Sequence, residues 1–242
     1  MSRFFSDNIV DNIIEISEQD SKHISKVLRM SIGDKITVCD LKGNDYLCTI
    51  KSINPSKVIV EVNEKRLSAT EPNVDITLYQ SLPKGDKFDL IIQKSVEIGV
   101  NKIVPIITNR CIPKLDKRTQ DKKILRYQKV SLEASKQSNR AKIPIISPFV
   151  SYNEALNEMK NKDVAILFYE KENTTLNKIL SNIHNAPKNI SIMIGPEGGF
   201  DEFEIKIARS LCISIASMGK RILRCETASI YSLSVLIFKF DI

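Results

Sequence analysis

The sequence predicts a mixed α/β protein with a small β-rich N-terminal domain and a larger domain built on a mostly parallel sheet. Short alternating apolar runs broken by polar turns fill residues 33–65, which is typical of hairpins in a small antiparallel barrel or sheet. From residue 74 onward, β-branched apolar runs alternate with segments of helical spacing, which indicates strands covered by helices on both faces. The stretch SATEPN, residues 68–73, has the composition of a linker, so the predicted domains are residues 1–70 and 73–242.

Each element can be assigned in order. In the first domain a short helix over about residues 20–30 precedes the hairpins, whose turns are predicted at KGND and NPSK. In the second domain Asp86 and Gly99 are typical boundary residues of a helix. The strands expected there are residues 74–82, 102–108, 143–147, 164–170, 189–194 and 212–217. The helices expected there are residues 86–99, 119–138, 153–160 and 175–183, and two more starting at 201 and 226.

Composition favours a cytoplasmic protein. The chain is 42% apolar and 27% charged, without an uncharged apolar run long enough for a membrane span and without a signal-peptide core. No CxxC pair occurs among its cysteines, which favours free thiols in a reducing compartment and argues against a metal cluster. The five cysteines are Cys39, Cys48, Cys111, Cys212 and Cys225. The two histidines, His23 and His184, have no other candidate metal ligands beside them in the sequence, so no metal is expected. The lack of a long apolar run means that no membrane partner is expected either.

The net charge of +7 is concentrated in one segment. Residues 101–142 hold twelve Lys/Arg and three acids, a net charge of +9, whereas residues 1–72 carry a net charge of −1. A charge run is usually a solvated helix face, but the acids that would alternate with these cations are nearly missing. We therefore expect a polyanionic partner, and nucleic acid above all.

The C-terminal helix is apolar on more than one side. Its sequence, ETASIYSLSVLIFKFDI, places large apolar side chains on two stripes, and each stripe needs a partner surface. One stripe can pack on the sheet. A homodimer interface is the simple partner for the other, and a helix sunk in the core of one domain is the alternative.

A glycine-rich loop joins the strand at 189–194 to the following helix. A phosphate-binding loop would continue with Gly-Lys-Ser/Thr, but Asp201 and Glu202 follow here, and a dinucleotide fingerprint belongs at the first strand of a sheet. Asp201 and Glu204 form a pair like a capping box at the start of a helix. The loop therefore predicts a neutral or cationic ligand that approaches bare backbone, with a tight turn that binds nothing as the alternative.

A second polar loop, residues 218–227, also runs from a strand into a helix. The carboxyl ends of parallel strands meet at one edge of the sheet, so the two loops are expected to converge on one site. Arg224 and Glu226 are the charged residues placed there, and a salt bridge at the helix start is the alternative explanation of Arg224.

Together these stretches resemble a known family. IGPEGGF with MGKRILRCETA resembles the last two knot loops of SPOUT-superfamily RNA methyltransferases, and is most similar to enzymes that methylate uracil N3 in small-subunit (16S) ribosomal RNA. Other stretches resemble parts of the same family and follow in the same order along the chain: RFF, HISKVLRMSIGD, the long stretch from QSLPKGDKF to TNRC, and EASKQSNRAKIP. The resemblance implies an N-terminal PUA-like β-barrel followed by a SPOUT α/β domain with a C-terminal trefoil knot. It also implies S-adenosyl-L-methionine as cofactor, a homodimer packed partly through the last helix, and ribosomal RNA or the small ribosomal subunit as partner.

The resemblance also assigns residues. The cofactor-binding residues it implies are Phe168, Ile194, Gly195, Pro196, Gly198, Gly199, Met218, Gly219, Ile222, Leu223 and Thr227. The residues expected to contact RNA are Arg3, Arg29, Lys84, Arg110, Asn139 and Arg140.

The chemistry of N3 methylation needs the imide proton to leave. A cation near O2 or O4 would stabilise the developing anion, and Arg140 or Arg224 is the candidate. Glu197 or Glu226 is the candidate proton acceptor, although positioning of a polarised imide can suffice. Cys225 is interpreted as a small buried residue and not as a nucleophile. Two rival functions predict different behaviour: a non-catalytic RNA-binding protein would not bind the cofactor, and a metabolic α/β enzyme would not bind RNA in a salt-dependent way.

Overall fold

The computed structural model describes residues 2–6, 8–10, 12–54, 56–111 and 115–241. The chain divides into two compact units, one formed by Met1–Glu71 with Ser135–Ile143 and the other by Pro72–Ala134 with Pro144–Ile242. The predicted linker at 68–73 contains the break between Glu71 and Pro72. The sequence did not predict that residues 135–143 group with the first unit.

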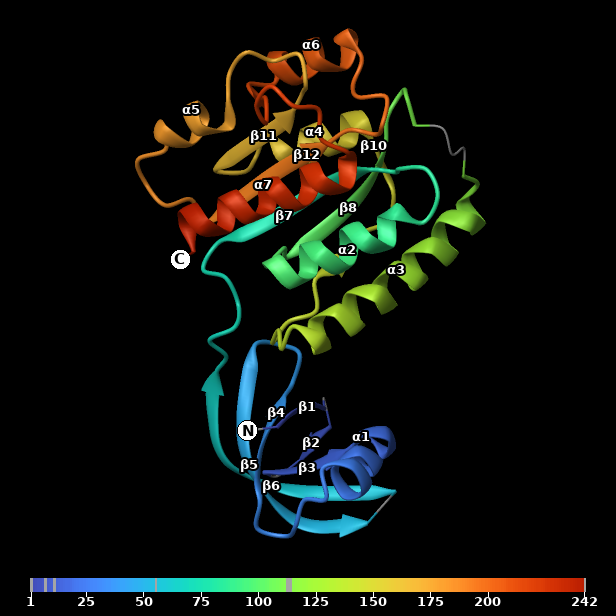
Figure 1. The fold of residues 1–242 in the computed structure, drawn as a ribbon, viewed down its shortest axis with the longest axis vertical. Helices are drawn as coiled ribbons and strands as arrows, with labels where there is room; N and C mark the ends of the chain where they lie inside the picture. Colours follow the sequence, from blue (N-terminus) through green and yellow to red (C-terminus); the bar gives the residue numbers. More distant parts are fainter. Residues whose placement is uncertain (1, 7, 11, 55, 112–114, 242) are drawn as a thin grey trace. The chain divides into compact units, whose positions relative to one another are not determined.

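The first unit is built on a six-stranded sheet with the order β1-β4-β5-β6-β3-β2 (Figure 1). The hairpins β4–β5 and β5–β6 were predicted, and both are antiparallel. Strand β1 was not predicted, and it pairs parallel to β4, so this sheet is mixed and not purely antiparallel. The strands are β1 (Arg3–Phe5), β2 (Ile9–Val10), β3 (Ile13–Ile16), β4 (Lys35–Cys39), β5 (Asn44–Asn54) and β6 (Lys57–Leu67).

One short helical segment closes the apolar side of this unit. Helix α1 (Glu18–Lys22) is capped by the Ser17 hydroxyl and continues as a π-helical turn, η1 (His23–Val27). The buried Ser21 hydroxyl accepts a hydrogen bond of 2.9 Å from the Val58 amide and so ties the helix to β6. The predicted helix at about 20–30 is therefore present, but it begins at Glu18 and ends at Val27.

The second unit contains a seven-stranded sheet in which every pairing is parallel, where the sequence predicted a mostly parallel sheet. The strand order is β10-β8-β7-β12-β11-β13, with β9 paired to β8. The strands are β7 (Asp75–Ser81), β8 (Lys102–Ile107), β9 (Ile145–Ile146), β10 (Val150–Ser151), β11 (Val164–Phe168), β12 (Asn189–Ile194) and β13 (Ser214–Ala216). The chain thus places β12 beside β7, the first strand of this unit, and β13 at the edge beside β11.

Helices cover both faces of the parallel sheet (Figure 1). Those that share a core with one face are α2 (Lys87–Ile98), α3 (Lys117–Gln137), α5 (Leu176–Ser181) and α7 (Cys225–Phe240). Those on the other face are α4 (Tyr152–Met159) and α6 (Glu202–Ser210). The boundary residues proposed for α2 hold in part, because Gly99 ends the helix at φ +128°, whereas Asp86 stands at the N-cap without a side-chain capping bond.

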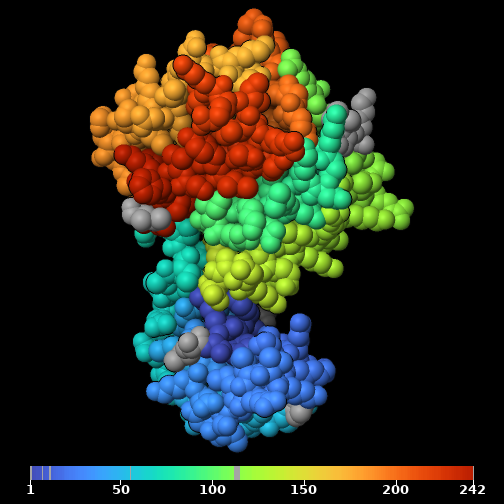
Figure 2. All heavy atoms as spheres, in the orientation of Figure 1, coloured from blue at the N-terminus to red at the C-terminus, as the bar shows by residue number. Residues whose placement is uncertain are grey.

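Helix α7 is buried by this chain on one side only. Leu233 and Leu236 are fully buried against the core, and the Ser229 hydroxyl donates a 2.5 Å hydrogen bond to Gln80 Oε1 on β7. On the other side Tyr231 is 42% exposed and Phe238 is 73% exposed. Figure 2 shows this C-terminal helix, in red, lying along the molecular surface. The second apolar stripe therefore has no partner among the described residues of the chain.

The described residues contain neither a membrane-spanning helix nor a cluster of metal ligands. Judged by length and hydropathy, their helices include no potential membrane span. Their His, Cys, Asp and Glu side chains form no cluster of three or more that could hold a metal ion. All five cysteines carry free thiols.

Candidate active site

A cavity of about 370 Å³ lies at the carboxyl ends of β11, β12 and β13. Three segments line it: residues 168–170 after β11, the glycine-rich loop 194–200 after β12, and residues 218–225 between β13 and α7. Parallel strands end at the same sheet edge, so their loops meet there. The convergence of the two loops is the arrangement that the sequence predicted.

Glycine makes room for neighbouring side chains at two positions of the loop after β12. A Cβ atom on Gly195 would lie 3.1 Å from the buried ring of Phe200. Gly199 has φ +66°, and a Cβ atom there would lie 3.0 Å from Glu170 Oε1. Larger residues would therefore push side chains out of the cavity wall or strain the backbone.

The same loop is held from outside by the segment after β8. The Asn109 amide nitrogens donate to Glu204 Oε1 at 3.0 Å and to Asp201 Oδ2 at 2.8 Å, and Arg110 Nη1 donates to the Gly198 carbonyl at 2.7 Å. Asp201 and Glu204 form both bonds of a capping box, as predicted, at the start of α6. These bonds fix the loop before any ligand arrives.

Glu197 projects from the loop toward the start of α2. Its Oε1 atom accepts hydrogen bonds from Lys87 Nζ at 2.9 Å and from the Lys84 amide at 3.2 Å. Burial acts to raise the pKa of Glu197, but the hydrogen bonds and the Lys87 charge outweigh it and hold the pKa below its ordinary value. The same hydrogen bond raises the pKa of Lys87, so the pair is ionised at neutral pH.

Cys225 and Glu226 begin α7 at the cavity edge. Burial, with the neighbouring carboxylates, raises the pKa of the Cys225 thiol to about 12, and the thiol donates to Glu226 Oε2 at 3.2 Å. Burial also acts to raise the pKa of Glu226, but hydrogen bonds and the charges of Lys87 and Arg224 lower it overall. A neutral, buried thiol agrees with the interpretation of Cys225 as a packing residue.

The cavity brings together most residues to which the resemblance gave a role. The predicted cofactor-binding residues that line it are Phe168, Ile194, Gly195, Pro196, Gly198, Gly199, Met218, Gly219, Ile222 and Leu223. Thr227 is exposed and lies outside the lining. Of the predicted catalytic residues, Glu197 and Arg224 line the cavity, whereas Glu226 lies beside it and Arg140 belongs to the first unit.

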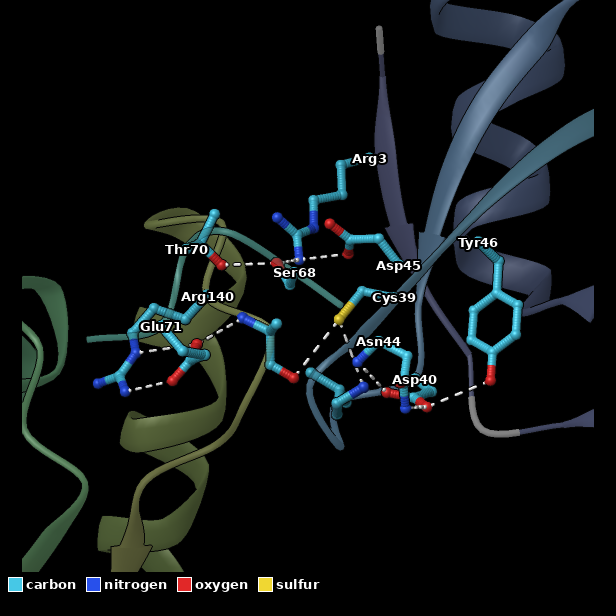
Figure 3. A network of polar contacts seen from close by, with 12 residues as sticks. Arg3, Cys39, Asp40, Asn44, Asp45, Tyr46, Ser68, Thr70, Glu71 and Arg140 are labelled. Atoms are coloured by element: carbon cyan, nitrogen blue, oxygen red, sulfur yellow. Dashed lines mark hydrogen bonds and ion pairs between the residues drawn. The ribbon is translucent and has the colours of Figure 1, made fainter. Parts of the chain in front are cut away.

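Arg140 is 3% exposed and forms a buried ion pair with Glu71 (Figure 3). This placement departs from the expectation that it faces RNA or the target base, because its guanidinium would first have to leave this carboxylate. Asn139 is exposed with φ +57°, and the Arg140 amide bonds back to the Ser135 carbonyl. Asn139 thus has the left-handed conformation that often ends a helix, here α3. The positive φ at this position therefore explains why an asparagine occupies it.

The other four residues expected to contact RNA differ in accessibility. Arg3 donates to Asp45 at 2.7 Å with its side chain 12% exposed, so its charge is already matched (Figure 3). Arg29 is exposed, with φ +50°. Lys84 and Arg110 are exposed beside the cavity loop that they bond to. Their contact with RNA stays a prediction.

Sequence reasoning missed Lys87, Asn109 and Ala228. Ala228 lines the cavity, Asn109 anchors the loop, and Lys87 holds Glu197. A signal for Lys87 was present in the sequence. The stretch SLPKGDK follows a predicted strand of the same sheet, and the carboxyl end of that strand lies at the sheet edge where the glycine-rich loop and the second polar loop were expected to meet. The neighbour relation between β7 and β12 was the missing information.

Comparison with known proteins identifies the family. A family model for an RNA methyltransferase domain matches residues 70–237, and one for an RNA methyltransferase PUA domain matches residues 16–63. The ribosomal RNA small subunit methyltransferase E of Bacillus subtilis is 31% identical, with 100% of this chain and 98% of that protein covered. The chain belongs to the ribosomal RNA small subunit methyltransferase E family.

Other family members agree over nearly the full length. The ribosomal RNA small subunit methyltransferase E of Mesomycoplasma hyopneumoniae is 33% identical, with 97% of this chain and 98% of that protein covered. The crystal structure of the Neisseria gonorrhoeae enzyme of the same name, bound to S-adenosyl methionine, matches with a TM-score of 0.83 and 30% identity. That comparison covers 98% of this chain and 97% of the other. The resemblance drawn from the motifs is confirmed, and the chain is an RNA methyltransferase with an N-terminal PUA domain.

Proposed function

We propose that this protein transfers a methyl group from S-adenosyl-L-methionine to N3 of a uracil in small-subunit ribosomal RNA. The observation that carries the proposal is the cavity itself, built at the sheet edge from the two motif loops of a chain in this methyltransferase family. A relative of the same family binds S-adenosyl methionine over a chain that aligns almost completely with this one.

The cavity fits this cofactor. Its volume of about 370 Å³ lies in the range of roughly 300–1,000 Å³ that holds small ligands. Buried Ile194 and Phe168 offer an apolar wall for adenine, and Gly195 and Gly199 expose backbone. The carboxylate of Glu170 suits a cationic ligand. When bound, the cofactor supplies an electrophilic methyl group on a sulfonium.

The finer fold is proposed with the function. Beyond β13, the Ser217 amide donates to the Thr174 carbonyl at 2.8 Å, and the Leu176 amide donates to the Ser217 carbonyl at 3.1 Å. The segment that leads to the second motif loop therefore lies against the chain that leaves β11. A C-terminal trefoil knot, which the family membership favours, would bring these two segments together in this way. For the first unit, the six-stranded mixed sheet supports a PUA-like barrel.

Basic side chains on α3 supply the RNA surface in this proposal. Five cations along the helix are exposed, Lys117, Arg118, Lys122, Arg126 and Lys129, and Arg126 is already paired with Asp86 and Asp89. Lys114, which belongs to the same basic stretch, lies outside the described residues. Phosphate contacts by such cations give affinity that falls steeply with salt. The PUA domain adds a second RNA-binding element, and the assembled small subunit in the cytoplasm is the proposed substrate.

Two copies of the chain form the proposed active assembly. Tyr231 and Phe238 leave an apolar stripe of α7 open in one copy, and a two-fold interface would cover the same stripe on both. The cavity ends at the start of this helix, so a partner would also lie close to the site.

Nucleoside mass spectrometry tests the reaction. The protein is incubated with S-adenosyl-L-methionine and small ribosomal subunits from a strain that lacks the modification, and the RNA is digested to nucleosides. Appearance of 3-methyluridine supports the proposal. A protein that binds the cofactor but forms no methylated nucleoside contradicts the target, and one that does not bind the cofactor contradicts the cavity assignment and favours an RNA-binding protein.

A further inference from the structure

Lys87 is a half-buried cation bonded to the cavity loop, whereas Arg110, which also bonds to that loop, is exposed. Lys87 is the first residue of α2, and its Nζ atom lies 2.9 Å from Glu197 Oε1 in the loop that forms the cavity wall. Its side chain is 35% exposed, so it is neither free in solvent nor sealed in the core. The charged or ionisable groups that act on it are Glu197 from the loop after β12, and Cys225 and Glu226 from the start of α7. The ammonium therefore lies between the start of α2 and the loop after β12, and the start of α7 acts on it through charge.

The two carboxylates beside Lys87 are poor proton acceptors. The pKa values of Glu197 and Glu226 both lie below their ordinary value, whereas an effective general base needs a pKa near the working pH. Both groups instead favour the charged form of Lys87. The two carboxylates thus help to keep the Lys87 ammonium charged and in place.

The alternative cations are less suited to act on the base. Arg140 belongs to the first unit and is only 3% exposed, whereas the Lys87 side chain is 35% exposed. Arg221 and Arg224 line the cavity, but both side chains are exposed to solvent. A donor that is fixed before the substrate arrives stabilises developing charge more effectively than a mobile one. Lys87 has three N–H donors, and its bond to Glu197 uses one of them.

We infer that Lys87 is a catalytic residue whose ammonium donates to a carbonyl oxygen of the target uracil and stabilises its N3 anion. This inference rests on the proposed function. The N3–H bond breaks and its proton passes to water; the N3 electron pair then forms the bond to the methyl carbon, while the electrons of the carbon–sulfur bond remain on sulfur. The positive charge leaves as the released proton, and the sulfur product is neutral.

Lys87→Met removes the ammonium and keeps the length of the side chain. We expect kcat for 3-methyluridine formation to fall about 100-fold, as when one donor to a developing oxyanion is removed. The Kd for S-adenosyl-L-methionine, measured by calorimetry, is expected to stay within about threefold, because the ammonium acts on the base. Lys87→Arg keeps a cation and should recover most of the lost rate.

Lys94→Met is the matched control. Lys94 lies on the same helix and pairs with Glu97 at the same distance of 2.9 Å, with its side chain 39% exposed. This variant should keep both kcat and cofactor affinity.

A fluorinated substrate separates charge stabilisation from a structural role. Fluorine at C5 makes the uracil imide more acidic, so subunits assembled on RNA transcribed with 5-fluorouridine need less help to form the N3 anion. The loss caused by Lys87→Met should shrink to less than about tenfold on that substrate. Unimpaired turnover of Lys87→Met, a parallel loss of cofactor affinity, or an equal loss on both substrates overturns the inference while the proposed function stands. An inactive wild-type enzyme overturns the proposed function, and this inference with it.

Discussion

The Glu71 carboxylate holds Arg140 at the turn that follows α3. Glu71 Oε2 accepts a 2.7 Å hydrogen bond from Arg140 Nη2, and Glu71 Oε1 accepts from the Ala141 and Lys142 amides at 2.7 and 3.0 Å (Figure 3). Both side chains are nearly buried, 10% exposed for Glu71 and 4% for Arg140. The carboxylate of Glu71, within the linker, therefore fixes the turn at residues 140–142, about seventy residues further along the chain.

Glu71→Gln should destabilise the first unit. The amide keeps an acceptor for the turn but leaves the Arg140 charge buried without its counterion, which costs about 3 kcal/mol in comparable pairs. Denaturant unfolding would measure the loss, and hydrogen exchange would locate it at the Ala141 amide. Glu64→Gln changes an exposed carboxylate of the same unit and should alter the free energy of unfolding by less than about 0.5 kcal/mol. Equal effects of the two variants would contradict a structural role for the pair.

Gly199→Ala should weaken cofactor binding about tenfold, because the added Cβ meets the Glu170 carboxylate in the cavity wall. Gly85→Ala is the control for backbone strain, since its φ of +67° matches the +66° of Gly199 and no atom lies within 4 Å of the new Cβ. The control should lose about 1 kcal/mol of folding stability and keep its cofactor affinity. Calorimetry and denaturant unfolding measure both quantities. If the two variants bind the cofactor equally well, Gly199 is present for its conformation alone.

The glycine-rich loops show what the sequence can predict. Their position between strand and helix patterns, and the acids that follow Phe200, indicated a sheet-edge site for a ligand other than phosphate, and the cavity lies there. Local signals also predicted the capping box of α6 and the end of α2 at Gly99. These features depend on residues that are close in sequence.

The residues whose surroundings the sequence did not predict depend on contacts between distant segments. Arg140 was expected at the RNA surface, but its environment is set by Glu71, and no local pattern links the two. Lys87 reaches Glu197 because β7 pairs with β12, a pairing of strands more than a hundred residues apart. The parallel pairing of β1 with β4 has the same origin. Sequence periodicity gives each element a buried face but does not give the order of the strands.

Cys225→Ala should retain turnover, because no step of N3 methylation needs a covalent nucleophile and the thiol is neutral at working pH. Burial raises the pKa of this thiol to about 12, so the thiolate that reacts with iodoacetamide is scarce at pH 8. Mass spectrometry of the folded protein should find Cys212, which is exposed, alkylated well before Cys225. Labelling of Cys225 should accelerate as the pH rises toward its pKa. Rapid labelling of Cys225 at pH 8, or loss of all turnover in Cys225→Ala with the cofactor still bound, would assign it a chemical role.

Phe238→Lys should convert the proposed dimer into monomers. Phe238 is 73% exposed on the outer stripe of α7, near Tyr231, and a lysine there would bring two like charges to a two-fold interface. Phe203→Lys is the matched control, because Phe203 is 67% exposed but lies on α6, on the opposite face of the sheet. Light scattering on the eluate of a size-exclusion column gives the mass of each variant directly. A monomeric Phe238→Lys beside a dimeric Phe203→Lys assigns the interface to α7. A dimer that survives Phe238→Lys places the interface elsewhere, and then the exposed stripe of α7 requires a different partner.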